Sequence, residues 1–455
     1  MYLSKYITIT SLDNKEKEYI IIHSYLGNID IVSSDIGKQI LEARKDNSAL
    51  YNIPLDILRQ MKKKKYIVDS EIEDKERFLK IANKISSKIR EKSLAYILIP
   101  SYECNFRCPY CFEANTVEKN EKYDPMSREL VDIIFQDIDN KQKNNTKVNI
   151  TLFGGEPLLE KNLDINAYIC EEAIKRNIPI HAITNGYSID EYYNLFKKGY
   201  FTNLQITIDG IQEGHDKRRY LENKQPTFSK IIQNIGEVLN IERGPSITVR
   251  INVDKDNYNE VIKLKDFFQE KNWIDNKKFN FYTKSVHACY VPTKDRVYDS
   301  DVVDNVILDK ENLKNMQFNM QYKRMVEDVK KIFDVNEKLP NLRTCTCGAA
   351  NGMRVIDNRG NIYSCWEQVD NDENIVGHVD INKRAFIYNE LWESWQNRHI
   401  ENIEKCSQCG YSLICGGNCP AHAKYATGDM FSSYCTDIKK TYNRVVKEVL
   451  LQNEK

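Results

Sequence analysis

Three closely spaced cysteines, Cys104, Cys108 and Cys111, are the residues whose spacing most directly suggests chemistry. Three thiolates on one short loop can bind three irons of a [4Fe–4S] cube, and the fourth iron is then open to a small molecule. Structural zinc is the alternative, but it needs four ligands, usually from two Cys-x2-Cys-like pairs. The loop has three cysteines and no neighbouring histidine. The spacing therefore favours a reactive iron–sulfur cluster over zinc or free thiols.

Eight more cysteines lie in the C-terminal part of the chain: Cys345, Cys347, Cys365, Cys406, Cys409, Cys415, Cys419 and Cys435. Eight thiolates are enough for two further [4Fe–4S] clusters with four ligands each. A zinc ribbon built from Cys406, Cys409, Cys415 and Cys419 is the alternative, but it leaves the other four without a role. The two remaining cysteines, Cys170 in a helical pattern and Cys289 before the C-terminal region, are predicted to be buried small apolar residues.

The composition limits the partners and the compartment. Lys+Arg and Asp+Glu both number 66, and this zero formal charge gives no reason to expect nucleic acid or an anionic membrane as a partner. No apolar stretch approaches the roughly 18 residues of a membrane span. The first residues do not form a signal-peptide core. Many cysteines without an export signal predict a cytoplasmic protein, in which cysteines more often bind metal or react than form disulfides.

Residues 1–70 are predicted to form a small winged-helix-like module. Its elements are strand patterns at Tyr6–Thr10 and Glu18–His23, helical patterns at Ser34–Arg44 and Pro54–Met61, and a closing strand at Tyr66–Val68. Residues 71–92 follow as a linker helix, because Phe78, Ala82, Ile85 and Ile89 share one helical face.

Strands and helices alternate from residue 93 to about residue 315. Six strand patterns lie at Leu94–Pro100, Val148–Phe153, Pro179–Thr184, Asn203–Asp209, Ser246–Val253 and Phe279–Thr283. Helical patterns between them, for instance at Ser127–Phe135 and Phe228–Leu239, predict an α/β fold with a parallel sheet that is either open or curled into a partial (β/α)6 barrel. The partial barrel is the fold that we expect. Chemistry in such folds lies at the carboxyl ends of the strands. The Cys104 loop, Gly154-Gly155-Glu156, Asn185 and Asp209 all fall there.

From residue 340 to residue 455 the pattern changes to cysteines, glycines and short irregular segments. We expect metal ligation, and not a hydrophobic core, to hold this region together. The sequence thus predicts a C-terminal cysteine-rich auxiliary-cluster domain that follows the barrel along the chain.

The Cys104–Cys111 loop, with the aromatic Tyr110 before its third cysteine, resembles that of the radical S-adenosylmethionine (SAM) superfamily. The resemblance implies that the open iron binds SAM, and that a 5′-deoxyadenosyl radical takes a hydrogen atom from the substrate. It also implies that Gly154, Gly155 and Glu156 meet the methionine ammonium, since glycines allow close backbone approach and a carboxylate accepts from a cation. The other SAM contacts that it implies are Tyr110, Asn185, Asp209, Arg250 and Asn252. For Arg250 and Asn252, ordinary strand-end hydrogen bonding is the alternative.

The C-terminal cysteines, with Gly360 five residues before Cys365, resemble the SPASM domain, which carries auxiliary clusters in enzymes that modify peptides and proteins. The resemblance implies one cluster on Cys345, Cys347, Cys365 and Cys419, and a second on Cys406, Cys409, Cys415 and Cys435, so three [4Fe–4S] clusters are expected in all. Only one residue separates Cys345 from Cys347. If one of them is not a ligand, the first auxiliary cluster keeps an iron that a substrate thiolate could fill.

These resemblances imply a radical SAM enzyme that modifies a ribosomally made precursor peptide, with a Cys thioether crosslink as the expected product. Carbon–carbon crosslinking, epimerisation and formylglycine formation by an anaerobic sulfatase-maturing enzyme are alternatives. The last implies an Asp directly after the Gly-x4-Cys cysteine, where this chain has Trp366. A multi-cluster electron-transfer protein without catalysis and a pure peptide-binding module are rivals from other classes.

The expected partners are a precursor peptide with a leader and a flavodoxin- or ferredoxin-type electron donor. The N-terminal module weakly resembles the leader-recognition element of ribosomal-peptide maturases, which adds the leader as a strand to an open sheet edge. An inert packing domain is the alternative.

Overall fold

The computed structural model describes residues 1–12, 17–90, 93–120, 124–143, 146–254, 256–286, 320–333, 341–435 and 438–453. The chain divides into two compact units. One unit consists of Met1–Glu91, Gln321–Ala350 and Asn397–Lys455, and the other of Lys92–Met320 and Asn351–Gln396. Within the described residues, no helix combines the length and the apolar character that a membrane span requires.

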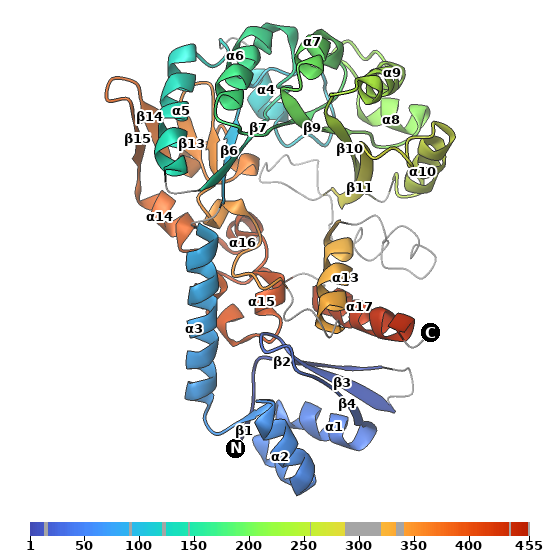
Figure 1. Ribbon diagram of the computed structural model, residues 1–455, viewed down its shortest axis with the longest axis vertical. Helices are drawn as coiled ribbons and strands as arrows, with labels where there is room; N and C mark the ends of the chain where they lie inside the picture. Colours follow the sequence, from blue (N-terminus) through green and yellow to red (C-terminus); the bar gives the residue numbers. More distant parts are fainter. Residues whose placement is uncertain are drawn as a thin grey trace. The chain divides into compact units, whose positions relative to one another are not determined.

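The second unit is built on a sheet in the order β11-β10-β9-β8-β7-β6-β12-β13-β14-β15 (Figure 1). Its first six strands are β6 (Ser93–Leu98), β7 (Lys147–Leu152), β8 (Ile180–Thr184), β9 (Phe201–Thr207), β10 (Ser246–Val253) and β11 (Phe279–Ser285). All pairs among these six are parallel. The six predicted strands and the partial (β/α)6 barrel are therefore confirmed.

Helices follow these strands along one side of the sheet (Figure 1). They are α4 (Ala114–Asn120), α5 (Arg128–Gln142), α6 (Leu163–Ile174), α7 (Tyr193–Lys197), α8 (Gln212–Arg218), α9 (Phe228–Asn240) and α10 (Glu260–Glu270), with 3-10 turns at Glu160–Asn162 and Ile189–Tyr192. Helix α5 begins after Ser127, whose hydroxyl accepts a hydrogen bond from Leu130 N at 3.2 Å. Fully buried Ile150, Leu204 and Val249 lie on the strands and make the sheet apolar where helices cover it.

Residues 351–396 extend this sheet beyond β6, which the sequence did not predict. Strand β12 (Arg354–Ile356) pairs in parallel with β6, and β13 (Asn361–Tyr363), β14 (Gly377–Asp380) and β15 (Ala385–Tyr388) continue antiparallel. Short 3-10 turns lie at Trp366–Gln368 and Asp372–Asn374, and α14 spans Glu390–Gln396. Val355, Ile356 and Ile362 are fully buried. The expectation that no hydrophobic core holds the chain after residue 340 is therefore wrong for this segment.

The first unit begins with the N-terminal module. It contains a sheet of β2 (Ile7–Ser11), β3 (Glu18–His23) and β4 (Ile29–Ser33), and a pair of β1 (Tyr2–Leu3) with β5 (Ile67–Val68). Helices α1 (Ser34–Ala43) and α2 (Leu55–Lys63), with a 3-10 turn at Asn47–Asn52, complete it. The two helices and the closing strand were predicted, but β1 and β4 were not. Strand β4 gave little signal because it has no fully buried residue, and Ile31 is 47% exposed.

The predicted linker helix is α3 (Glu71–Arg90). Phe78 and Ala82 are fully buried and Ile85 is half-buried on its apolar face, whereas the Ile89 side chain lies outside the described residues. Phe78 and Ala82 pack against Ile400, Ile403 and Leu413 of the cysteine-rich segment. The linker helix therefore belongs to the core of the first unit.

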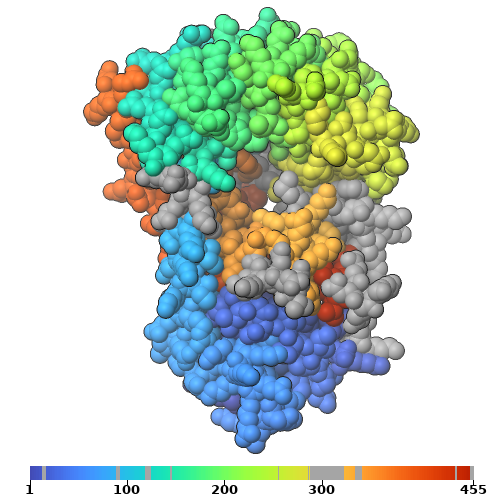
Figure 2. All heavy atoms as spheres, viewed as in Figure 1, coloured from blue at the N-terminus to red at the C-terminus, as the bar shows by residue number. Residues whose placement is uncertain are grey.

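The N-terminal module shares a second core with the C-terminal elements. Ile20 and Ile22 of β3 pack with Met325 and Val329 of α13 (Met320–Phe333) and Tyr442 of α17 (Ile438–Asn453). Figure 2 shows the blue N-terminal residues directly against the orange residues of this helix on one face. The remaining elements of this unit are α15 (Ser412–Cys415), α16 (Pro420–Thr427) and 3-10 turns at Gly348–Ala350, Ile400–Asn402 and Cys406–Gln408. The module is thus packed onto the cysteine-rich segment and is not a separate appendage.

Candidate active site

The three-cysteine loop follows β6 and is held by the segment after α8. Phe106 forms an isolated antiparallel bridge with Leu221. On either side of this bridge, Arg107 N donates to Tyr220 O, and Glu222 N donates to Asn105 O, both at 3.0 Å. These main-chain contacts hold residues 105–107, which lie between Cys104 and Cys108, against the segment after α8.

The chemistry of the three thiols fits an iron–sulfur cluster. Burial raises the pKa of Cys104 well above its usual value, and Glu156, Cys108 and Cys111 raise this pKa further. Burial and the nearby Glu113 raise the pKa of Cys111 to about 12. Cysteine binds metals as the thiolate, and three thiolates this close together repel one another. Bound iron cations would remove this repulsion between the three negative charges. Phe106 N also donates to Cys104 Sγ at 3.4 Å.

No three His, Cys, Asp or Glu side chains of the described segments converge in a way that would hold one metal ion. In a [4Fe–4S] cube each thiolate binds a different iron. The ligands of a cube therefore surround a volume and do not meet at one point.

The glycine pair after β7 packs directly onto the cysteine loop. Gly154 and Gly155 have φ of +88° and +48°, which favours glycine. A Cβ on Gly155 would lie 2.3 Å from Glu103 O and 2.5 Å from Tyr102 O. Glu156 N donates to Glu103 O at 2.8 Å. The turn thus fits against the main chain just before Cys104, and only glycine allows that approach.

The Glu156 carboxylate is buried, with 1% exposed, and it accepts three hydrogen bonds from its own chain. The donors are Thr184 Oγ1 at 2.6 Å, Asn185 N at 2.6 Å and Leu158 N at 2.9 Å. The Asn185 side chain in turn donates to Asn105 Oδ1 at 2.8 Å in the cysteine loop. Glu156 therefore ties the ends of β7 and β8 together beside the loop, with room for about one further donor.

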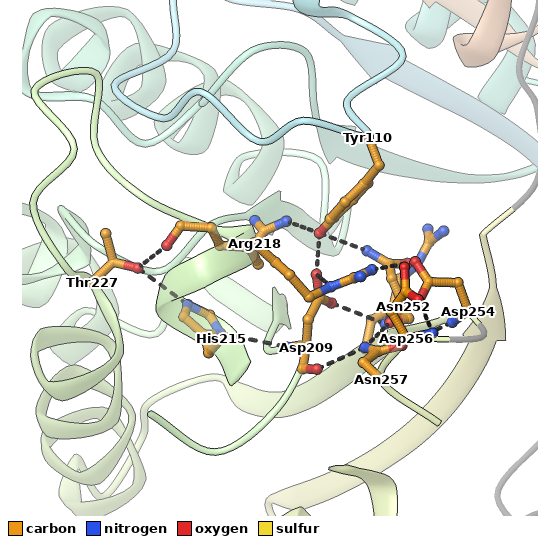
Figure 3. A network of polar contacts seen from close by, with 11 residues as sticks. Tyr110, Asp209, His215, Arg218, Thr227, Asn252, Asp254, Asp256 and Asn257 are labelled. Atoms are coloured by element: carbon orange, nitrogen blue, oxygen red, sulfur yellow. Dashed lines mark hydrogen bonds and ion pairs between the residues drawn. The ribbon is translucent and has the colours of Figure 1, made fainter. Parts of the chain in front are cut away.

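Tyr110 is the centre of a second polar group (Figure 3). Its hydroxyl donates to Asp209 Oδ2, and it accepts from Arg219 at 2.7 Å and from Asn252 Nδ2 at 3.3 Å. Asn252 N also donates to Asp209 Oδ1 at 3.0 Å, and Arg250 Nε donates to Asn252 Oδ1 at 2.8 Å. The structure therefore brings all the predicted SAM-contact residues to the carboxyl ends of the strands.

Sequence reasoning missed the arginines Arg218 and Arg219 that complete this network. Arg218 forms an ion pair with Asp254 Oδ2, with the charged atoms 2.8 Å apart, and its Nε lies 3.7 Å from Asp209 Oδ2. Arg219 is 9% exposed, and its guanidinium lies 5.7 Å from the Phe106 ring centroid. The pattern Arg218-Arg219, ten residues after a strand-end Asp, was the available signal.

His215 and Glu113 are further buried groups that the sequence did not single out. Asp209 N donates to His215 Nδ1 at 3.3 Å, so the ring proton is on Nε2, which is 3.1 Å from Thr227 Oγ1 (Figure 3). Burial lowers the pKa of His215 well below its usual value, so the ring is neutral. Glu113 lies 5% exposed directly after Cys111 and Phe112, and burial raises its pKa to about 7.

An aromatic group replaces the acid that formylglycine chemistry would require. Trp366 packs against Phe153 with ring centroids 6.0 Å apart, and Phe153 stacks on Phe112 at 6.3 Å. Because Phe112 follows Cys111 and Phe153 precedes Gly154, Trp366 lies beside the cysteine loop as a large apolar surface.

The auxiliary cysteines divide between the two units. Cys365 lies in the unit that contains the barrel, and the other seven lie with the N-terminal module. Cys345 is buried and its Sγ donates to Cys347 O at 3.5 Å, whereas Cys347 is exposed. Cys170 is buried on α6, as predicted, and Cys289 lies outside the described residues.

Three cysteines of the predicted second auxiliary set share one pocket. Cys406, Cys409 and Cys435 line a pocket of about 630 Å³ in the first unit. Its other lining residues include four basic ones, Lys5, Arg44, Lys405 and Lys439, and two acidic ones, Glu71 and Glu404. The fold thus brings together thiols that are up to 29 residues apart in the sequence.

Residues 98–268 match the family described as the radical SAM superfamily. The chain contains a radical SAM domain. Its cysteine-rich C-terminal region fits a SPASM domain, and the radical SAM domain implies a [4Fe–4S] cluster and SAM as cofactors. The resemblance found in the sequence is thereby confirmed, as is the expectation of an enzyme.

Two known proteins and one solved structure are similar to this chain over most of its length. It is 25% identical to a cysteine-type anaerobic sulfatase-maturating enzyme of Clostridium novyi, over 79% of this chain and 96% of that protein. It is 23% identical to the radical SAM cyclopropyl synthase TigE of Paramaledivibacter caminithermalis, over 92% and 89%. Native anSMEcpe, solved with bound AdoMet and the Cp18Cys peptide, shares its fold with a TM-score of 0.53 and 20% identity, over 79% and 96%.

Proposed function

We propose that this radical SAM enzyme modifies a ribosomally made precursor peptide and most readily forms a Cys thioether crosslink. The observation that carries the proposal is the first unit, which holds seven of the eight C-terminal cysteines. In this unit a module with an open sheet edge shares its cores with Cys406, Cys409 and Cys415. Such an arrangement suits a substrate that is long enough to be held at one place and modified at another. The similarity to a sulfatase-maturating enzyme and a cyclopropyl synthase, both over most of the chain, supports peptide chemistry.

The residues of the barrel have defined tasks in this reaction. A [4Fe–4S] cluster on Cys104, Cys108 and Cys111, with SAM, would supply a 5′-deoxyadenosyl radical. Glu156 holds Thr184 and Asn185 beside the cysteine loop, and the Gly154-Gly155 turn offers main-chain groups at close approach. Tyr110, Asp209 and Asn252 form a polar wall whose hydroxyl, carboxylate and amide groups can bind ribose and amino-acid groups. The aromatic group around Trp366 presents an apolar surface that excludes water from a reactive radical.

A thioether bridge has a definite atom and electron balance. A C–H and an S–H bond of the precursor are lost and one C–S bond forms. The hydrogen atom leaves as 5′-deoxyadenosine, the thiol proton goes to solvent, and one electron goes to an acceptor of the iron–sulfur class. We propose that the acceptor is one of two auxiliary clusters, which are bound by the two cysteine sets already named. With the cluster of the barrel this makes three cubes and about twelve irons per chain.

Mass spectrometry of a Cys-containing precursor peptide, which we would first look for beside this gene, tests the bond. We expect a loss of two hydrogens per bridge and a bridged Cys that no longer reacts with an alkylating agent. A Cys→Ser precursor should not be bridged. If two hydrogens are lost while every Cys stays alkylatable, the thioether proposal is wrong and a carbon–carbon bridge is formed.

Two other outcomes correspond to the alternative functions. The similarity to a cyclopropyl synthase over 92% of this chain favours carbon–carbon bond formation as the second candidate. The 25% identity to a sulfatase-maturating enzyme favours formylglycine formation, which would appear as loss of sulfur and gain of oxygen at Cys. Trp366, packed against Phe153, stands where that chemistry needs an acid. Epimerisation would leave the mass unchanged.

The electron donor that we propose is a flavodoxin- or ferredoxin-type protein. Such donors carry an acidic surface, and the pocket lined by Cys406, Cys409 and Cys435 has more basic than acidic residues around it. Charge complementarity of this kind mainly raises the rate of encounter and makes it sensitive to salt.

We propose that the leader adds as a strand to the outer edge of β4. In the part of the chain that the structure describes, β4 pairs only with β3. The hydrogen bonds from His23 N to Asn28 O and from Ser34 N to Lys17 O show which residue pairs of β3 and β4 are hydrogen-bonded. Because such pairs alternate along an antiparallel ladder, the main-chain groups of Asp30 and Val32 point toward β3. The main-chain groups of Ile29, Ile31 and Ser33 therefore point away from the sheet, and a leader strand can pair with them.

Replacing Ile31 by Pro should block this edge and leave the module folded. Proline removes an N–H group that points outward, and edge strands accept it there. We expect precursor affinity to fall about tenfold, since one to two hydrogen bonds contribute about 1.5 kcal/mol together. Fluorescence anisotropy with a labelled precursor measures this effect.

Ile31→Val is the matched control, because it keeps the N–H group and the β-branched side chain. It should bind the precursor like the wild type, and both variants should retain iron and cleave SAM in the absence of peptide. Unchanged precursor affinity of Ile31→Pro would show that the β4 edge does not bind the leader. Point variants are a sharper test than deletion of residues 1–70. Such a deletion would expose the cores that the module shares with α13, α17 and the cysteine-rich segment.

A further inference from the structure

Arg398 is a buried arginine among the auxiliary cysteines, and the functions derived above do not use it. It is 1% exposed. Its guanidinium donates to three main-chain carbonyls, those of Met430, of Gly417 at 2.9 Å and of Ser432 at 3.4 Å. No Asp or Glu of the described residues forms an ion pair with it. The positive charge is thus enclosed without a carboxylate.

The carbonyls that hold Arg398 belong to the loops that carry the auxiliary cysteines. Gly417 lies between Cys415 and Cys419, and Ser432 is three residues before Cys435. A Cβ on Gly417, whose φ is +75°, would lie 2.8 Å from a guanidinium nitrogen of Arg398. The neighbouring Gly416 is equally close to the main chain of Cys345, because a Cβ there would lie 2.7 Å from Cys345 O. Arg398 therefore lies where the loops of both predicted ligand sets meet.

The charged groups that act on the pKa of Arg398 are thiols of both ligand sets. Burial lowers the pKa of Arg398, and the negative charges of Cys406, Cys419, Cys347 and Cys415 raise it. A guanidinium does not lose its proton in proteins, and an unpaired buried charge costs several kcal/mol. A [4Fe–4S] cube with four thiolate ligands is an anion in both of its common states. Two such anions would provide the missing counter-charge.

We propose that Arg398 is the shared counter-cation of the two auxiliary clusters and keeps the reduction potentials of both high enough to accept an electron. This inference rests on the two auxiliary clusters of the proposed function. Reduction adds a negative charge to a cluster, and a fixed cation nearby stabilises the reduced state more than the oxidised one. Hydrogen bonding and charge near a cluster are among the factors that set its potential. One cation between two clusters lets both be tuned together.

An EPR-monitored redox titration of the reconstituted holoenzyme tests the proposal. In Arg398→Gln we expect the ratio of reduced to oxidised form of both auxiliary clusters, at a fixed potential, to fall tenfold or more, which is about 59 mV for one electron. The cluster on Cys104, Cys108 and Cys111 should titrate as in the wild type. Arg398→Lys keeps the charge, and its auxiliary ratios should stay within about threefold of the wild type.

Arg354→Gln is the matched control, since Arg354 is also a buried arginine, 5% exposed, but bonds Tyr388 and lies beside Asp137 in the barrel unit. It should leave all potentials unchanged. If Arg398→Gln loses auxiliary iron and Arg398→Lys keeps it, the charge is required, and the proposal is supported without a titration. Equal loss of iron in both variants, or unchanged potentials in Arg398→Gln, would overturn the proposal. If the wild type instead binds only about four irons per chain, the auxiliary clusters are absent, and the proposed function and this inference both fail.

Discussion

Replacing Cys104, Cys108 and Cys111 together by alanine should abolish the formation of 5′-deoxyadenosine. Cys104, Cys108 and Cys111 are the only cysteines in the loop between β6 and α4, so the triple variant has no thiolate there with which to place a cluster beside SAM. We expect a fall of at least about a thousandfold, which corresponds to about 4 kcal/mol of transition-state stabilisation. Chromatography of reaction mixtures that contain SAM and a strong reductant measures the product.

The iron content of the same variant separates loss of the site from loss of the fold. It should fall from about twelve to about eight irons per chain, because the auxiliary cysteines are untouched. Cys170→Ala is the control, since it removes a fully buried thiol on α6 that binds no iron, and it should retain both iron and activity. Undiminished cleavage of SAM by the triple variant would place the radical chemistry elsewhere.

Replacing Gly155 by alanine should have nearly as large an effect through geometry alone. The added Cβ would come within 2.3 Å of Glu103 O and 2.5 Å of Tyr102 O, and both atoms belong to the main chain that leads into the cysteine loop. The loop or the turn must move, and the Glu156 N to Glu103 O bond at 2.8 Å is then lost. We expect a fall in SAM cleavage of about a hundredfold or more, or about 3 kcal/mol.

Gly199→Ala tests whether backbone strain alone would have that effect. Gly199 also has a positive φ, +73°, but the nearest atom to an added Cβ is 3.8 Å away. Strain in the left-handed region costs about 1–2 kcal/mol, so Gly199→Ala should lower the thermal midpoint slightly and keep full activity. If the two variants cleave SAM equally well, the close packing of Gly155 on the loop has no catalytic importance.

Much of the barrel follows directly from local sequence patterns. Each of the six parallel strands was predictable because it is a short apolar run between turn residues, and β10 has the predicted bounds, Ser246–Val253. The assembly of the site followed as well. Parallel strands end at one edge of a sheet, so Tyr110 and Asp209 could be expected to meet although 99 residues separate them.

Strands β4, β12 and β13 were harder to predict, for two physical reasons. Strand β4 lies at the edge of its sheet and has no fully buried residue, and a strand that buries little carries a weak sequence pattern. Strands β12 and β13 lie inside their sheet, but with three residues each they are too short to show a period. The pairing of β4 with β3 and of β12 with β6 depends on main-chain hydrogen bonds, which side-chain periodicity does not encode.

The sequence by itself indicated the chemistry to expect: which cysteines are candidates to bind iron, which strand ends carry polar residues, and that Trp366 stands where formylglycine chemistry implies an acid. Only the tertiary structure decided which partners these residues have. It placed Cys365 in the barrel unit apart from the other auxiliary cysteines, packed the N-terminal module onto the cysteine-rich segment, and surrounded Arg398 with cysteine-bearing loops. The reason is that residue types and spacing are local properties, whereas burial and charge environment come from surfaces that meet only when the chain folds.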